Sequence, residues 1–109
     1  EDIVDLLNYF ITGRKNNEYT IASTSQIFNP LTEAWNRDIL HDLEIPGNFL
    51  QEIIYPGSKV GPLARSVKRE LRIDKDISVV AVGSHDTASA VAGTPFTNRK
   101  NNVFFLIFI

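Results

Sequence analysis

The sequence predicts an α/β fold, because strand-like and helix-like patterns alternate along the chain. Residues 77–82 form a nearly continuous β-branched run that ends at Gly83, as expected for a strand covered on both faces. Residues 86–93 then favour a helix of small side chains. In α/β sheets the ligand-binding groups gather at the carboxyl ends of strands. Residues 83–86 are therefore the first candidate for a functional site.

The first half of the chain shows one clear helical pattern and one extended segment. Apolar residues recur at the spacing i, i+3, i+4 and i+7, which predicts a helix over residues 2–12 that stops at Gly13. The members of this stripe are Ile3, Leu6, Leu7 and Phe10. Asn16-Asn17 favours a turn, and residues 19–21 favour extended backbone because aromatic and β-branched side chains suit strands.

A second helix is predicted between two breaks that contain proline. Asn29-Pro30 interrupts the chain, Thr32 is a favourable N-cap, and Pro46-Gly47 ends the segment. The apolar face of this helix carries Trp35, Ile39, Leu40 and Leu43. Residues 49–54 then favour a turn of helix followed by a short extended piece.

A third helix is predicted where basic residues cluster in residues 63–72. The basic side chains are Arg65, Lys68, Arg69 and Arg72. An anion-binding patch and a solvated helix face both fit this pattern, but Glu70 and Asp74 dilute the charge and no aromatic platform accompanies it. We therefore expect a solvated face and no role in nucleic-acid binding. After Pro95, residues 103–109 favour a final strand.

Composition limits the remaining possibilities. A chain of 109 residues with 43% hydrophobic and 22% charged residues is typical of a folded domain with one small core. Its net charge of -2 gives no general electrostatic reason to bind nucleic acid or anionic membranes. The absence of cysteine excludes disulfides and thiolate metal sites, and the acidic start does not resemble a signal peptide. The composition thus favours the cytoplasm, without a membrane partner.

Asp86 is the most interesting residue of the 83–86 turn, and two interpretations fit it. Aspartate is a favoured helix N-cap, and Asp86 stands at the start of a predicted helix. A carboxylate at the rim of a crevice also has the chemistry of a general base for phosphoryl transfer to a sugar hydroxyl. His85 beside it fits either a hydrogen bond to a polyol or an ordinary polar loop position.

Two other chemistries suit the turn less well. A metal-dependent phosphohydrolase needs further histidine and aspartate ligands, and the only other histidine, His41, falls on a predicted amphipathic helix. A Ser-His-Asp triad is excluded by geometry, because three consecutive residues at a strand end cannot point at one another. No metal site is predicted.

Several passages resemble one family in the same order along the chain. Residues 79–91, Val-Val-Ala-Val-Gly-Ser-His-Asp-Thr-Ala-Ser-Ala-Val, resemble the segment that holds the catalytic aspartate of the rhamnulokinase branch of the FGGY carbohydrate kinases. Residues 6–24 are similar to the helix and the "TG…E-x-T-x-A" passage of that family. Residues 35–46 resemble its "W-x-x-x-L-L…I-P" helix, and residues 55–61 resemble the turn that follows.

The resemblance implies a fragment of an actin-like, ribonuclease H-like two-domain kinase fold with an incomplete sheet. Residues 1–92 would be the C-terminal part of the FGGY N-terminal, sugar-binding domain, and residues 93–109 the truncated start of the nucleotide domain. The family transfers the γ-phosphoryl group of Mg-ATP to a ketose, and rhamnulokinases act on the 1-hydroxyl of L-rhamnulose. By resemblance Asp86 would be the catalytic base and His85 a substrate-binding residue.

The sequence also departs from the family pattern. It lacks an amino-terminal Asp-x-Gly phosphate loop and a glycine-rich adenosine site, so we expect no cofactor to bind this fragment alone. After Leu106 the family continues toward a second phosphate loop, whereas this chain ends in Ile107-Phe108-Ile109. We therefore expect a truncated product whose apolar end favours association. A kinase for L-fuculose or L-xylulose, and a non-catalytic structural or interaction module, remain as alternatives.

Overall fold

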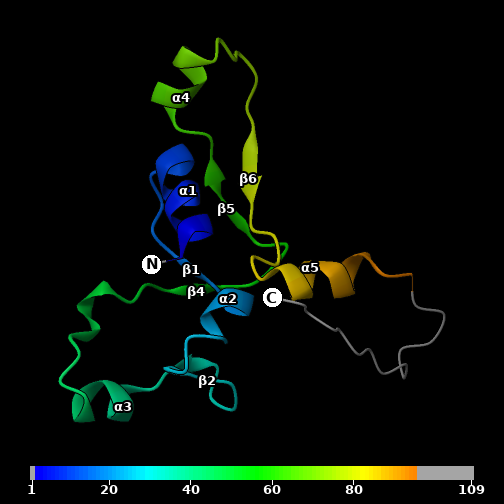
Figure 1. The fold of residues 1–109 in the computed structure, drawn as a ribbon. Helices are drawn as coiled ribbons and strands as arrows, with labels where there is room; N and C mark the ends of the chain where they lie inside the picture. Colours follow the sequence, from blue (N-terminus) through cyan, green and yellow to red (C-terminus); the bar gives the residue numbers. More distant parts are fainter. Residues whose placement is uncertain (1, 96–109) are drawn as a thin grey trace.

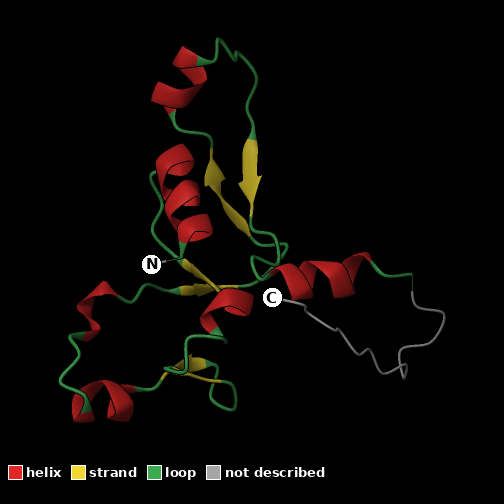
Figure 2. Cartoon of the chain, viewed as in Figure 1, coloured by secondary structure: helices red, strands yellow, loops and turns green. Residues whose placement is uncertain are grey.

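The computed structural model describes residues 2–95, in which helices are interspersed with short strands (Figure 2). The helices are α1 (Ile3–Thr12), α2 (Tyr19–Ala22), α3 (Arg37–Asp42), the 3₁₀ turn η1 (Gly47–Phe49), α4 (Arg65–Glu70) and α5 (Asp86–Gly93). The strands are β1 (Asn17–Glu18), β2 (Phe28–Asn29), β3 (Ala34–Trp35), β4 (Ile53–Ile54), β5 (Lys59–Pro62) and β6 (Ser78–Val80). This mixture of helices and strands agrees with the predicted α/β class.

The strands form three separate two-stranded sheets. β1 pairs in parallel with β4, while β2 with β3 and β5 with β6 form antiparallel pairs. The pairing of β5 with β6 continues past β6, because the Gly57 amide donates to the Ala81 carbonyl and the Ala81 amide donates to Ser58. In Figure 1 the β5–β6 pair and α1 form one arm, α3 lies at the end of another, and α5 leads away from the place where α2 and β4 meet.

The helix α1 begins and ends where the sequence predicts. The Asp2 carboxylate accepts the Val4 amide at 3.1 Å, and Gly13 adopts the left-handed conformation with φ 73° while its amide bonds the Tyr9 carbonyl. The apolar stripe is not a core face within residues 2–95, however, since Ile3, Leu7 and Phe10 are exposed there.

Two local predictions are wrong, and side-chain capping explains both. Residues 19–21 form helix α2 rather than extended backbone, because the preceding Glu18 side chain accepts the Thr20 and Ile21 amides. Thr32 caps no helix: it lies in a turn organised by Asn29, and Asn36 is the N-cap of α3. Trp35 therefore belongs to a strand, paired with Phe28.

The strand predicted over residues 77–82 is shorter than expected. β6 covers only Ser78–Val80, and among residues 2–95 it pairs on one side, with β5. Val80 and Val82 are exposed, so the prediction of a strand covered on both faces is wrong for the described part of the chain. The turn and helix that follow, by contrast, start and end as predicted.

The remaining predictions agree in part. The extended piece near residue 54 is β4 and the basic helix is α4, but the turn of helix, η1, lies earlier than predicted, and Asn17 belongs to β1 rather than to a turn. The Lys68 ammonium of α4 bonds the exposed Asp76 carboxylate at 2.9 Å. Within residues 2–95 no helix has the length and apolar character to cross a membrane. The strand predicted over residues 103–109 lies outside the described residues, and the cytoplasmic location stays a prediction.

The described chain has an open arrangement with a small core. Its Cα radius of gyration is 16.6 Å, against ~13 Å for a compact chain of about 100 residues. The buried apolar side chains are Ala22, Phe28, Leu40, Val60 and Ala81. Four polar residues are buried as well, and they lie where α1, β1 and α2 meet: Asp5, Asn16, Asn17 and Glu18. The candidate site adjoins this polar cluster.

Candidate active site at the start of α5

His85 and Asp86 form the amino-terminal end of α5. His85, and not Asp86, is the N-cap: its ring Nδ1 accepts the Thr87 amide at 3.2 Å. Asp86 is the first helical residue, and its carboxylate shares the same Thr87 amide at 2.6 Å. The N-cap interpretation of Asp86 is thus wrong by one residue. The Asp86 side chain is 91% exposed and the His85 side chain 31%.

Two backbone amides of the turn that leads to Asp86 donate hydrogen bonds to side chains at the start of α2. The Ser84 amide donates to the Glu18 carboxylate at 3.0 Å, and the His85 amide donates to the Thr20 hydroxyl at 3.1 Å. Gly83 packs closely on α5, because a Cβ there would lie 3.3 Å from the Ser89 hydroxyl and 3.4 Å from Ala88. The turn is therefore held from both sides, while the Asp86 carboxylate stays open to solvent.

Glu18 is the central residue of this arrangement. Its side chain is fully buried, with 0% exposure, and its two oxygens accept four donors. Three of these donors belong to α2: the Thr20 amide at 3.0 Å, the Ile21 amide at 3.3 Å and the Thr20 hydroxyl. The fourth is the Ser84 amide. One carboxylate thus caps α2 and binds the candidate catalytic turn at the same time.

A second buried carboxylate supports Glu18 from the other side. Asp5 of α1 is 2% exposed and accepts the Asn17 side-chain amide at 2.9 Å and the Glu18 backbone amide at 3.1 Å. Burial raises the pKa of Asp5 above its ordinary value, although both hydrogen bonds act to lower it. Asn17 in turn accepts the Gln51 amide at 2.9 Å. These bonds connect α1, β1 and the segment before β4.

An open groove of about 280 Å³ lies between α2 and α5. Its lining includes Tyr19, Thr20, Ser23, His85, Thr87 and Val91. The lining thus includes the hydroxyl-bearing residues Thr20, Ser23 and Thr87 and the imidazole of His85, which are groups that can bond a polyol. The structure thus brings His85 to a groove, while Asp86 stands at the exposed start of the same helix.

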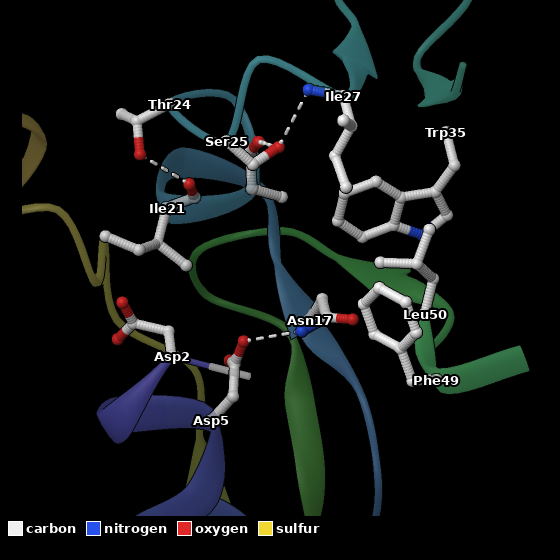
Figure 3. A pocket seen from close by; sticks show the side chains of 11 residues that line it. Asp2, Asp5, Asn17, Ile21, Thr24, Ser25, Ile27, Trp35, Phe49 and Leu50 are labelled. Carbon is white, nitrogen blue, oxygen red and sulfur yellow. Dashed lines mark hydrogen bonds between the residues drawn. The ribbon is translucent and has the colours of Figure 1, made fainter. Parts of the chain in front are cut away.

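A second cavity of about 270 Å³ lies on the other side of α2 (Figure 3). Figure 3 shows its apolar wall and its polar wall, which is formed by Asp2, Asp5 and Asn17. The apolar wall consists of Ile27, Trp35, Phe49 and Leu50. The Trp35 indole donates to the Gln51 carbonyl at 2.8 Å, which fixes the ring against this wall. The carboxylates of this cavity are distinct from Asp86.

The residues at the start of α5 do not fit a polyphosphate. A helix amino terminus binds phosphate through free amides, but the Thr87 amide is already bonded by His85 and Asp86, and Asp86 adds negative charge. In the described part of the chain no three histidine, cysteine or acidic residues are grouped as metal ligands. That Mg-ATP does not bind this fragment alone stays a prediction.

Sequence reasoning identified His85 and Asp86 but assigned no role to the residues that hold them. Glu18 and Thr20 were visible only as the E-x-T part of a resemblance, and Asp5 falls within an otherwise ordinary helical pattern. A buried acidic residue leaves no periodic signal, because its partners come from distant parts of the sequence. Glu18 and Ser84 are 66 positions apart.

Comparisons with known proteins agree with the predicted family. The profile of the FGGY family of carbohydrate kinases, N-terminal domain, matches residues 2–93. A rhamnulokinase from Oceanobacillus iheyensis is 36% identical over 94% of this chain and 21% of its own length. A rhamnulokinase from Bacteroides thetaiotaomicron is 37% identical over 88% of this chain and 20% of its own length. The chain thus spans about a fifth of the length of these curated relatives.

Solved structures show the same fold. A ligand-bound xylulose kinase from Lactobacillus acidophilus superposes with a TM-score of 0.66 at 25% identity, covering 73% of this chain and 16% of that protein. A gluconate kinase from the same organism gives a TM-score of 0.68 at 24% identity, covering 75% of this chain and 17% of that protein. The described residues are therefore an α/β fragment of the actin-like, ribonuclease H-like kinase fold with an incomplete sheet. The domain division at residues 92 and 93 stays a prediction. The chain belongs to the FGGY family of carbohydrate kinases.

Proposed function

We propose that this chain is the segment of a sugar kinase that supplies the catalytic base, Asp86, and a sugar contact, His85. One observation carries the proposal: an exposed carboxylate directly follows two amides that are bound to the buried Glu18 carboxylate and to the Thr20 hydroxyl of α2. A general base must be accessible to its substrate and fixed in position, and this arrangement meets both conditions. His85 faces the adjacent groove, where its imidazole can bond a sugar hydroxyl.

In the full-length parent, the reaction we propose is ATP-dependent phosphorylation of L-rhamnulose at its 1-hydroxyl. The Asp86 carboxylate accepts the hydroxyl proton while the sugar oxygen attacks the γ-phosphorus of ATP, and the bond from that phosphorus to the ADP oxygen breaks. Several relatives at 36–39% identity are rhamnulokinases, which supports this substrate. The phosphate donor and its magnesium would be bound by other parts of the parent, so the fragment alone is inactive.

Related ketoses are the second candidate substrates. L-xylulose and L-fuculose are these candidates, and a xylulose kinase is among the similar solved structures. A substrate panel on the full-length protein decides between them: the highest kcat/KM should belong to L-rhamnulose. A clear preference for either other ketose would replace the proposed substrate without changing the role of Asp86.

The first test is Asp86→Asn in the full-length protein. Amide replaces carboxylate with nearly the same shape, so kcat should fall by about 10²- to 10⁴-fold while the fold is kept. Asp74→Asn is the matched control, because Asp74 is an exposed aspartate outside the turn, and it should retain full activity. Turnover by Asp86→Asn at the rate of the control would contradict the proposal.

A non-catalytic interaction module is the remaining alternative. Two experiments together test this alternative. One is calorimetric titration of the 109-residue chain with Mg-ATP and with L-rhamnulose, and the other is the Asp86→Asn change in the full-length protein. We expect no ATP binding by the chain alone and loss of turnover in the full-length Asp86→Asn variant. A folded full-length parent without any kinase activity would favour the interaction module.

A further inference from the structure

The two hydrogen bonds that hold the catalytic turn lead to a single carboxylate. Ser84 donates its amide directly to a Glu18 oxygen at 3.0 Å. His85 donates its amide to the Thr20 hydroxyl at 3.1 Å, and that hydroxyl donates to the same Glu18 oxygen. Two consecutive amides of the turn are therefore bound to Glu18, one directly and one through Thr20.

The chemistry of these groups sets the direction of each bond. A carboxylate only accepts hydrogen bonds, so the Thr20 proton must point toward Glu18. The lone pairs of the Thr20 oxygen are then left for the His85 amide. A hydroxyl oriented by a carboxylate is a stronger and more directional acceptor than a freely rotating one. Thr20 thus acts as a fixed relay between Glu18 and His85.

Burial shows that this arrangement is specific. Glu18 is fully buried, and within residues 2–95 no salt bridge to a basic side chain accompanies it. Its charge is stabilised by amide and hydroxyl donors instead, and a buried charge is costly without such donors. Capping α2 alone would need only the two α2 amides. The bond to Ser84 is the additional feature that connects the cap to the turn.

We propose that Glu18 and Thr20 are positioning residues for catalysis, which fix the turn so that Asp86 points toward the reacting hydroxyl. This inference rests on the proposed function, since it assumes that Asp86 is the base. Binding two successive amides fixes the rotation of the turn about its own axis, and Asp86 follows directly after them. Small errors in the placement of a catalytic group reduce the rate strongly, while substrate binding can remain.

The variant that tests the relay is Thr20→Val in the full-length protein. Valine keeps the shape of threonine but lacks the hydroxyl, so the His85 amide loses its acceptor. We expect kcat to fall by about 10- to 100-fold. Because His85 is held by the same hydroxyl, the KM for L-rhamnulose can rise, but by less than kcat falls. Thr20→Ser restores the hydroxyl and should restore most of the rate.

Thr12→Val is a matched control within the same chain. The Thr12 hydroxyl has the same pattern of bonds, because it donates to the Asn8 carbonyl and accepts the Arg14 amide at 3.1 Å, but it lies at the end of α1. Amide hydrogen exchange provides the structural readout. In Thr20→Val, exchange should accelerate at His85, whereas in Thr12→Val it should accelerate at Arg14 and leave His85 and kcat unchanged.

The outcomes separate this inference from the proposed function. If Asp86→Asn abolishes turnover but Thr20→Val keeps full kcat, the positioning role is wrong and the function stands. If Asp86→Asn stays active, the function is wrong and the positioning role falls with it, whatever exchange at His85 shows. If Thr20→Val does not fold, Glu18→Gln replaces it. A folded Glu18→Gln protein with unchanged kcat and unchanged exchange at Ser84 would also overturn the inference.

Discussion

The junction around Glu18 and the outer arms of the molecule are stabilised in different ways. We define the Glu18 junction as the hydrogen-bonded polar network of Asp5, Asn17, Glu18, Thr20, Ser84 and His85, of which the first three are buried. There, hydrogen bonds connect α1, β1, α2 and the turn before α5. The outer arms, by contrast, end in α3 and α4 and leave apolar side chains in solvent: Leu43 is 62% exposed and Leu71 is 61% exposed.

This difference shows which part of the chain determines the position of the candidate site. Apolar contacts stabilise without strong directional preference, whereas hydrogen bonds to a buried carboxylate have defined lengths and directions. The candidate base, Asp86, lies beside the Glu18 junction, although most residues of the junction are distant from it in the sequence. The junction therefore sets the position of the site, and changes in the arms should affect it less.

The largest expected effect is that of Glu18→Ala. Removing this carboxylate leaves buried donors without an acceptor, which should reduce the free energy of unfolding by about 3 kcal/mol or more. Asp76→Ala is the matched change in an arm: it removes an exposed carboxylate that bonds Lys68, so its effect on stability should be much smaller than that of Glu18→Ala. Denaturant unfolding of the two variants checks this contrast. Equal effects would show that the junction is no more important than the arms.

A smaller effect is expected in the pH dependence of the free energy of unfolding that comes from Asp5. Burial raises its pKa above 3.8, whereas the hydrogen bond with Lys68 lowers the pKa of Asp76 below 3.8. The folded state then binds more protons at Asp5 than the unfolded state does. The contribution of Asp5 to the free energy of unfolding should thus fall as pH rises from about 3.8 through its raised pKa.

Asp76 provides the control for the pKa of Asp5. Asp76 should behave in the opposite way, and the stability that it contributes should be lost as pH falls from 3.8 through its lowered pKa. Carbon-13 titration of the two side-chain carboxyl groups gives both pKa values in one experiment. An Asp5 pKa equal to or below that of Asp76 would contradict the description of Asp5 as a buried carboxylate in the junction.

Local sequence patterns predicted the elements that depend on local interactions. The helix α1 is defined by its own cap, Asp2, and by Gly13, and α5 follows directly from a glycine turn and a run of small residues. Elements that depend on a distant or unexpected partner were predicted wrongly. Trp35 fits a helical face, but it forms a strand because Phe28 pairs with it.

The candidate site shows the same division. Local pattern placed His85 and Asp86 at the start of a helix, and family resemblance gave them chemical roles that stay predictions. Glu18 and Thr20 were not recognised as their supports, because the bonds to Ser84 and His85 join segments more than 60 positions apart. The capping role of Glu18 involves amides that follow it directly in the sequence, whereas its bond to the turn before α5 joins distant segments.

The most direct test of the central claim is a structure of the full-length protein with its ketose bound. If Asp86 is the base, one of its carboxylate oxygens should lie about 2.6–3.2 Å from the hydroxyl that is phosphorylated, with the Ser84 and His85 amides still bound to Glu18 and Thr20. A ketose bound with its reacting hydroxyl beyond reach of Asp86, both directly and through one water, would contradict the account.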